Sequence, residues 1–387
     1  MATRSDSEKQ GVEAPRALRP EEHASALRLL NSVLRPNSPP SILQEYPLVL
    51  DKGNIENMRV IAKGKEVVAH AAVYFSQVRS SDLVFKVGGI GSVATHPAYR
   101  DQGLGSAVVR DCIQVMARSG CHFSLLWTQR HDFYRNLGYE SAGSSYLFRV
   151  RTSDLASIPC DCRIVPFSPQ YLPSIIEIHE REALRSERTR EEYESYFGIP
   201  KTNTLVALRN NTVSAYAVMG KGEDLRHCVH EWGGNASDLL CLAREFAHLW
   251  SLHEFIVLAP TQESAQMSVQ ETFPHLLEQM GARRVFEYLA MIRIIDAEAL
   301  SSLVRGYVST RLGKDFQIRR TESGVAIRIG EEQTLLGKTL PSSPHSAAGL
   351  LARILFGPEP PSTLFPGLSA LDHALPIPLF IWGLDSV

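Results

Sequence analysis

The chain has 387 residues, 44% of them hydrophobic, and its 40 basic and 42 acidic side chains leave a formal net charge of −2. This length predicts two or three domains, and the near-neutral charge argues against a nucleic-acid partner. No apolar run approaches membrane-spanning length, and the polar residues 1–13 lack the apolar core of a signal peptide. We therefore expect a cytoplasmic protein without a membrane partner, and a disordered tail at residues 1–14.

Six cysteines bear on the redox environment and on metal binding. Cys112, Cys121 and Cys241 lie within apolar patterns, which is typical of reduced thiols in a core. Cys160 and Cys162 are the one close pair, and no second Cys/His pair follows at the spacing of a zinc site. We predict three reduced core thiols and no metal site.

The first third of the chain predicts strands followed by a helix. Alternating and apolar runs indicate strands at residues 58–63, 67–78 and 84–95, with a turn at Gly64-Lys65. An amphipathic helix is predicted from Leu104 and ends at Gly120. The apolar run 121–127 then suits a buried strand.

Residues 96–107, His-Pro-Ala-Tyr-Arg-Asp-Gln-Gly-Leu-Gly-Ser-Ala, join the strand to the helix. Glycines allow close backbone approach, and the N–H groups and dipole of a helix start favour an anion. The spacing is that of neither a P-loop nor a dinucleotide fingerprint, which has glycine where this chain has Val108. What remains is Arg-x-x-Gly-x-Gly after a strand, with Arg100 as a side-chain cation. An ordinary strand-to-helix turn is the alternative for this motif alone.

This motif resembles the acyl-CoA pyrophosphate loop of the GNAT superfamily of N-acetyltransferases. A second segment, Phe133-Tyr134-Arg135-Asn136-Leu137-Gly138-Tyr139, resembles the aromatic-Tyr-x-x-x-Gly-aromatic signature of the same superfamily. The two signatures occur in the expected order with a strand between them. The resemblance implies that acetyl-CoA is the co-substrate and that no metal is needed.

The second third of the chain repeats this outline. Strands are predicted at 162–166, 204–209, 213–219, 227–232, 254–258 and 288–295, and helices at 170–182, 189–196, 238–250 and 272–280. After the strand 227–232, however, the chain reads Gly233-Gly234-Asn235 without the Arg-x-x-Gly-x-Gly pattern. We interpret this unit as a degenerate copy that binds no cofactor.

The last third differs from both. It predicts helices at 300–311 and 346–356, strands at 316–319, 325–329 and 333–337, and an apolar tail at 375–382. This lobe resembles a sterol-carrier fold, and the whole layout resembles the enhanced intracellular survival (Eis) type of N-acetyltransferases. We therefore predict a mixed α+β fold with an acetyl-CoA-binding GNAT domain at 15–152, a degenerate GNAT-like domain at 153–296 and a sterol-carrier-like domain at 297–387.

The resemblance also implies site residues. Backbone groups after Ile90 would bind the pantetheine arm, the loop would hold the pyrophosphate, and two residues after the strand 121–127 would contact the cofactor. The cofactor residues predicted in this way are Val93, Ala94, Thr95, Arg100, Asp101, Gln102, Gly103, Leu104, Gly105, Ser106, Gln129 and Arg130.

Acyl transfer to an amine also needs an acid and a base. Tyr134 is the candidate acid, because a pKa near 10 suits protonation of a thiolate; a core tyrosine beside Phe133 is the alternative. In the Eis type the C-terminal carboxylate reaches the active site, which here implies Val387 as the base. His70, His96 and Glu231 are other candidates, although such residues are more often structural.

Two classes of function stay open at this point. The first is an N-acyltransferase that acts on a primary amine of a small molecule or on an exposed peptide amine. The second is a non-catalytic acyl-CoA sensor or lipid-binding module. The intact loop together with Tyr134 favours the enzyme. The sequence names neither the acceptor amine nor the acyl chain, and it leaves a homo-oligomer open.

Overall fold

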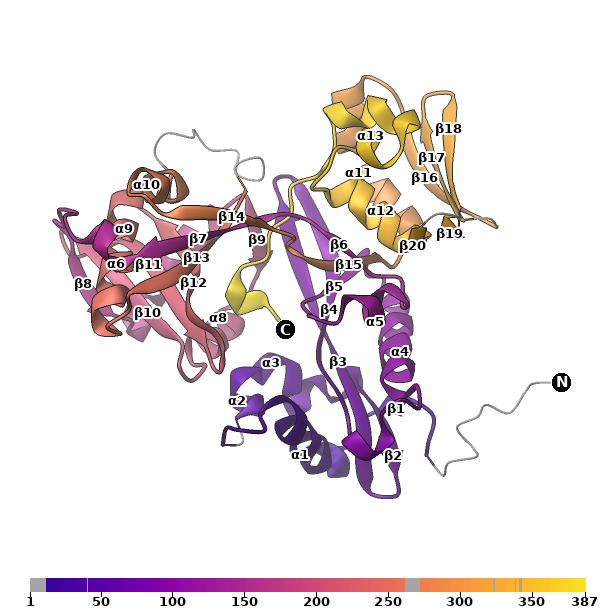
Figure 1. Cartoon of the computed structure of the whole chain (residues 1–387), viewed down its shortest axis with the longest axis horizontal. Coiled ribbons are helices and arrows are strands. Elements are labelled where there is room, and N and C mark those ends of the chain that lie inside the picture. Colours follow the sequence, from indigo (N-terminus) through magenta and orange to yellow (C-terminus); the bar gives the residue numbers. More distant parts are fainter. Residues whose placement is uncertain (1–11, 40, 262–271, 323, 338, 341–342) are drawn as a thin grey trace.

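The structure of the chain is a computed structural model that describes residues 12–39, 41–261, 272–322, 324–337, 339–340 and 343–387. Two mixed sheets with helices on their faces and a third, smaller lobe make up the fold (Figure 1). The predicted mixed α+β class is confirmed. Within the described residues, no helix combines the length and the apolar character needed to cross a bilayer.

The first sheet has eight strands in the order β1-β2-β3-β4-β5-β15-β6, with β9 paired to β3. The helix α4 (Leu104–Arg118) covers one face of it. The helices α1 (His23–Leu34), α2 (Ile42–Glu45) and α3 (Pro47–Leu50) cover the other. The strands are β1 (Arg16–Ala17), β2 (Met58–Lys63), β3 (Glu66–Ser80), β4 (Leu83–Thr95), β5 (Phe123–Leu126), β6 (Glu140–Ala142), β9 (Leu184–Glu187) and β15 (Ala290–Ile294).

The second sheet has seven strands in the order β14-β7-β13-β12-β11-β10-β8. Its helices are α6 (Thr152–Leu155), α7 (Leu172–Glu180), α8 (Arg190–Phe197), α9 (Ala236–Leu249) and α10 (Phe273–Gln279). The strands are β7 (Ser145–Arg151), β8 (Arg163–Pro166), β10 (Asn203–Arg209), β11 (Thr212–Lys221), β12 (Asp224–Gly234), β13 (Glu254–Pro260) and β14 (Arg283–Glu287).

The two sheets exchange strands. β7 follows β6 directly in the chain but lies in the second sheet, between β13 and β14. In return β15 lies in the first sheet, between β5 and β6. The two crossing segments meet where the Leu289 N–H donates to the Gly143 carbonyl at 3.3 Å. The predicted domain boundary between residues 152 and 153 therefore does not separate the sheets. β7 lies before this boundary but pairs with β13 and β14, which lie after it.

The third lobe packs against the first sheet. It contains a three-stranded sheet, a two-stranded sheet and helices. The Phe356 ring packs against the rings of Phe85 and Phe123 with centroid distances of 5.7 and 5.0 Å. Its likeness to a sterol carrier stays a prediction. The elements are α11 (Ala297–Leu312), β16 (Phe316–Thr321), β17 (Gly324–Ile329), β18 (Glu332–Gly337), β19 (Thr339–Leu340), β20 (Ser343–Ser346), α12 (Ala347–Phe356) and α13 (Pro361–Leu364).

The apolar tail leaves this lobe and runs between the two sheets, so that the chain ends at the centre of the molecule (Figure 1). Trp382 is 1% exposed and packs edge-on against Trp232 and Phe380. The tail is therefore part of the core and not a frayed end.

At the other end of the chain, residues 1–11 of the predicted disordered tail lie outside the described residues. For residues 12–14 the prediction is wrong. Val12 is buried against the first sheet, and the Glu13 N–H donates to the Ala62 carbonyl at 3.0 Å.

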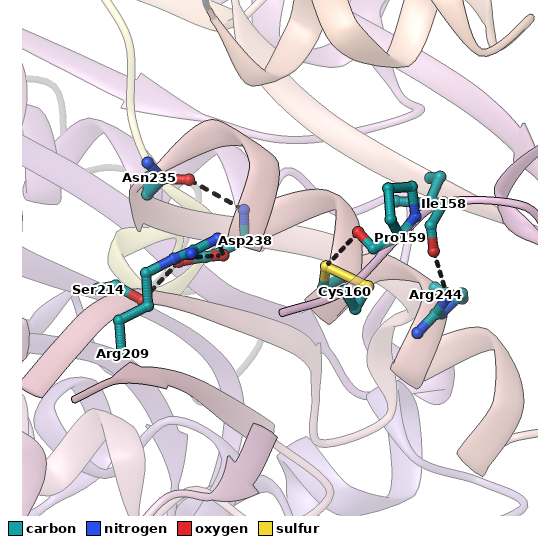
Figure 2. Close-up of a disulfide and its surroundings, with 9 residues drawn as sticks. Ile158, Pro159, Cys160, Arg209, Ser214, Asn235, Asp238 and Arg244 are labelled. Atoms are coloured by element: carbon teal, nitrogen blue, oxygen red, sulfur yellow. Dashed lines mark hydrogen bonds and ion pairs between the residues drawn. A yellow bond between two sulfur atoms is a disulfide. The ribbon is translucent and has the colours of Figure 1, made fainter. Parts of the chain in front are cut away.

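The prediction of a reduced thiol at Cys241 is also wrong. Cys241, on α9, forms a disulfide with Cys160, and the two Cα atoms are 5.8 Å apart (Figure 2). The link before β8 runs over α9, where the Arg244 side chain donates to the Ile158 carbonyl at 2.5 Å. A separation of 81 residues hid this pairing from the sequence. Cys112 and Cys121 are free and buried, as predicted.

We expect this disulfide to stabilise the protein. A crosslink that closes a loop of 81 residues restricts the unfolded chain, and its loss should lower the free energy of unfolding by about 2–4 kcal/mol. Denaturant unfolding with and without a thiol reductant measures the difference. Cys160→Ser is the matched control, because it should carry the same loss and no longer respond to the reductant. A wild-type chain that is indifferent to the reductant would contradict the prediction.

Candidate functional site

A cavity of about 540 Å³ opens where β4 separates from β5. It gathers residues from α1, β4, the loop before α4, α4 itself, the segment after β5, and the end of the chain. Its lining is Val33, Leu34, Ile90, Gly91, Ser92, Val93, Ala94, Thr95, Tyr99, Arg100, Asp101, Gly103, Leu104, Gly105, Ser106, Trp127, Thr128, Arg130, Phe133, Tyr134 and Val387.

The strands separate because β4 bends. Its parallel pairing with β5 ends at Gly89 and Leu125, although β4 continues to Thr95. The bend lies at Ser92, whose φ of 52° is left-handed, and there the register with β3 shifts between His70 and Ala72. Backbone groups of β4 beyond the bend therefore line the cavity without a strand partner on the β5 side.

His70 supports the bend and is not placed to act as a base. It is fully buried, and its Nδ1 lies 2.8 Å from the Ser92 carbonyl oxygen. Burial lowers the pKa of His70 to about 4, so the ring is neutral at neutral pH. His96 is also structural, since its Nδ1 accepts a hydrogen bond from the Ala98 N–H.

The loop before α4 presents free backbone donors. Asp101 and Gly103 both have positive φ, of 61° and 76°, and turn the chain into the helix. Gly103 is the N-cap and offers no side chain to the first turn, so the N–H groups there stay open to a ligand. A Cβ at Gly105 would lie 3.2 Å from Thr95 Oγ1, so glycine keeps strand and helix close at this point.

The structure gathers most of the predicted cofactor residues around this one cavity. The exceptions are Gln102 and Gln129, which are exposed and do not line it. The Gln102 side chain instead donates to the Ala98 carbonyl at 3.5 Å. Val33 and Leu34 also line the cavity but were not predicted, because they belong to α1, which is far from both motifs in the chain.

Tyr134 lies on the short helix α5 (His131–Arg135) with its ring packed edge-on against Phe133 and Tyr139, at 4.9 and 6.0 Å. It is largely buried but still lines the cavity. Burial raises the pKa of Tyr134 to about 12, and the charge of Arg130 opposes this shift. The hydroxyl therefore stays protonated throughout the neutral range and can donate a proton.

The C-terminal residue Val387 enters the same cavity. It packs on two glycines of β4: a Cβ at Gly91 would lie 2.7 Å from the Val387 carboxyl carbon, and one at Gly89 would lie 2.7 Å from Val387 Cγ2. Any side chain at these positions would displace the chain end. The structure therefore brings together the predicted acid and the predicted base.

Glu231, the remaining candidate base, is already paired. It is fully buried on β12, and Arg188 donates to its two oxygens at 3.0 and 2.6 Å. Tyr216 donates to it as well, at 3.2 Å. Because its oxygens are engaged in these bonds, we assign Glu231 a structural role and not that of the base.

The described residues of the second unit do not form the corresponding site. Asn235 alone separates β12 from α9, where the first unit has residues 96–103 between β4 and α4. The Asn235 side chain caps α9 by accepting from the Asp238 N–H at 3.1 Å, and the buried Asp238 carboxylate pairs with Arg209 (Figure 2). In addition, the Trp232 indole donates to the Leu258 carbonyl of β13 at 2.9 Å, beyond the last β12–β13 pair. Asn235 therefore occupies the start of α9, and Trp232 occupies the space beyond the last β12–β13 pair.

Comparison with known proteins supports this assignment of the first unit. Residues 14–142 match the acetyltransferase (GNAT) domain family. The chain therefore carries an acetyltransferase domain of the GNAT type, as the two motifs predicted. No curated protein sequence matches the chain.

Solved structures share the fold over nearly the whole chain. A GCN5-related N-acetyltransferase from Anabaena variabilis is 16% identical with a TM-score of 0.68, covering 97% of this chain and 100% of that one. One from Kribbella flavida is 18% identical with a TM-score of 0.61 and the same coverage. Eis1 from Mycobacterium abscessus is 16% identical with a TM-score of 0.58, covering 94% and 96%. At these identities the likeness concerns the fold, which the chain shares with Eis1.

Proposed function

We propose that this chain, whose residues 14–142 are an acetyltransferase domain of the GNAT type, transfers an acetyl group from acetyl-CoA to a primary amine. The acceptor is a small molecule or an exposed peptide amine. One observation carries the proposal: a single cavity joins the open start of α4, the Tyr134 side chain and the C-terminal residue Val387. A non-catalytic sensor would need the first of these features and neither of the other two.

The chemistry of the cavity lining suits acetyl-CoA. The N–H groups at the start of α4 and the Arg100 guanidinium suit a pyrophosphate, because both favour negative charge. The bent part of β4, Val93–Thr95, would bind the amide groups of the pantetheine arm through its backbone. The thioester would then lie between β4 and β5, towards Tyr134.

Val387 and Tyr134 supply the groups for the chemical step. The Val387 carboxylate would accept a proton from the acceptor ammonium and so free the nitrogen lone pair. The amine nitrogen would attack the thioester carbonyl carbon, a C–N bond would form, and the C–S bond would break. The Tyr134 hydroxyl would donate its proton to the departing thiolate. The nitrogen loses its second proton to solvent as the amide forms, Tyr134 regains a proton from solvent, and the carboxylate releases the proton that it accepted, so one proton is released in each turnover.

A second cavity lies on the acceptor side, with one acidic residue in a mainly apolar lining. This cavity of about 550 Å³ includes Asp51, Tyr74 and Ser195 in its lining. Tyr74 is paired opposite Gly89, the glycine on which Val387 packs, so its ring lies on the same face of the sheet as the chain end. The Tyr74 hydroxyl also donates to Glu192 on α8. The Asp51 carboxylate in the lining and the Glu192 carboxylate bound to Tyr74 favour a cationic acceptor such as an ammonium.

The cofactor site is tested by Gly105→Asp. The new side chain would meet Thr95 and bring negative charge to the donors that suit the pyrophosphate. We expect calorimetry to give one CoA per wild-type chain and a steep loss of affinity in the variant. Gly306→Ala is the matched control, because a Cβ there contacts nothing within 4 Å. A folded Gly105→Asp chain with unchanged CoA affinity, or two equivalent CoA sites per wild-type chain, would exclude this site assignment.

Tyr134→Phe tests the acid. Only the hydroxyl is removed, so the ring packing and the CoA affinity should persist while turnover falls on the order of 100- to 10,000-fold. Release of free CoA thiol is followed against a panel of aminoglycosides, polyamines and peptides. In the wild type, ionisation of Tyr134 should reduce activity only as the pH approaches about 12. Turnover at the wild-type rate in the variant would mean that another group protonates the thiolate.

The chain end is tested by moving its charge. A short C-terminal tag replaces the Val387 carboxylate with an amide, and the same tag at Met1 serves as the control. We expect the C-terminal tag to reduce turnover on the order of 100-fold or more and to leave CoA affinity nearly unchanged. Equal rates for the two tagged proteins would remove Val387 from the mechanism.

A further inference from the structure

Two buried cations of the second unit hold the last residues of the chain. The first is Arg188, between β9 and α8, whose side chain is 1% exposed. Its guanidinium donates to Asp385 at 2.7 Å through both Nε and Nη2. Its remaining face binds Glu231, so one arginine joins a carboxylate of the tail to a carboxylate of β12. The rings of Tyr193 and Tyr196 lie 5.2 and 5.1 Å from the guanidinium carbon.

The second cation is Lys221, at the end of β11 and 2% exposed. Its ammonium donates to the carbonyls of Gly383 and Leu384, at 3.3 and 3.0 Å, and to that of Ser386. Three successive donations to the backbone fix the course of the tail. They do not depend on which side chains the tail carries.

The last residues of the tail pass from the core of the second unit to that of the first. Leu384 is fully buried in the core of the second unit, beside Tyr216 and Val218. Three residues later Val387 packs with the core of the first unit, on the face of β4. The tail therefore bridges the two units, and its last contact with the second unit lies immediately before its reactive end.

A metal ion is a weaker explanation for this cluster. Ligand atoms of His179, Glu231 and Asp385 lie within 4.8 Å of one another. The Arg188 guanidinium, however, already binds both carboxylates. Both carboxylates therefore already have a cationic partner within the protein.

We propose that Arg188 and Lys221 are positioning residues that hold the C-terminal carboxylate of Val387 in the active site of the first unit. This rests on the proposed function of Val387. Chain ends fray unless they are tied down, and a general base must lie within hydrogen-bond reach of the proton that it accepts. The second unit then contributes to the reaction by anchoring the chain end and not by binding a ligand.

The test uses Lys221→Met, which keeps the length of the side chain and removes its three donors. We expect kcat to fall about tenfold or more while the KM for acetyl-CoA and the CoA affinity stay within about twofold, since only the chain end is released. Digestion with a carboxypeptidase, followed by mass spectrometry, should release Val387 about tenfold faster than from the wild type. Lys201→Met is the control, because Lys201 pairs with Glu223 at the surface.

A double-mutant cycle separates positioning from general stability. Deletion of Val387 removes the group that Lys221 positions, so adding Lys221→Met to the deletion should change kcat no further. If Lys221→Met does not fold, Asp385→Asn replaces it, because this variant keeps its shape and loses the charge that faces Arg188. A merely structural role would give additive losses and a lower thermal midpoint.

The outcomes separate this proposal from the proposed function. Faster release of Val387 in a protein that binds CoA but acetylates no amine would support the anchoring and refute the catalytic role. Unchanged release and unchanged kcat in folded Lys221→Met and Asp385→Asn would overturn the anchoring and leave the proposed function intact.

Discussion

The exchange of strands between the two sheets is the constraint on which the rest of the structure depends. Without β15, the facing edges of β5 and β6 would lose the strand that pairs with both of them. Without β7, the facing edges of β13 and β14 would likewise lose their common partner. Buried N–H and C=O groups must find partners, so neither sheet is complete alone. The two units are thereby fixed side by side, and the chain end lies in the gap between them (Figure 1).

That gap is filled by the tail, and glycines decide how closely it approaches. Gly89 and Gly91 leave the face of β4 bare, and Val387 occupies the space that side chains would take. The tail is held by charge on one side and by packing on the other, since Asp385 binds Arg188 while Trp382 packs against Trp232. Buried charges carry a desolvation cost, which is offset here because Arg188 binds both Asp385 and Glu231. Here the geometry that they fix brings the chain end to Tyr134.

The two units have a similar strand order but differ at the start of the helix that follows the central strand. In the first unit a glycine N-cap and an eight-residue link, residues 96–103, leave the start of α4 open. In the second unit the Asn235 side chain caps α9, and the Asp238 carboxylate adds negative charge beside it. The N-terminus of α4 therefore favours an anion, whereas the N-terminus of α9 disfavours one. The difference arises from a few residues at each helix start and leaves the surrounding sheets alike.

The sequence by itself determined what depends on neighbouring residues. The bounds of β2, the start of α4 and the turn at Gly103 follow from periodicity and from local backbone preference, and the two motifs identified the acetyltransferase domain. It did not determine the strand exchange, the pairing of β9 with β3, or the Cys160–Cys241 bond, because a short strand or a thiol carries no record of its distant partner. The predicted boundary after residue 152 followed chain order and left β7 with the first unit, whereas the structure pairs β7 with β13 and β14 of the second sheet. The resemblance suggested that the chain end reaches the active site, but only the tertiary structure decided its route, since Arg188 and Lys221 meet the tail about 160–200 residues away along the chain.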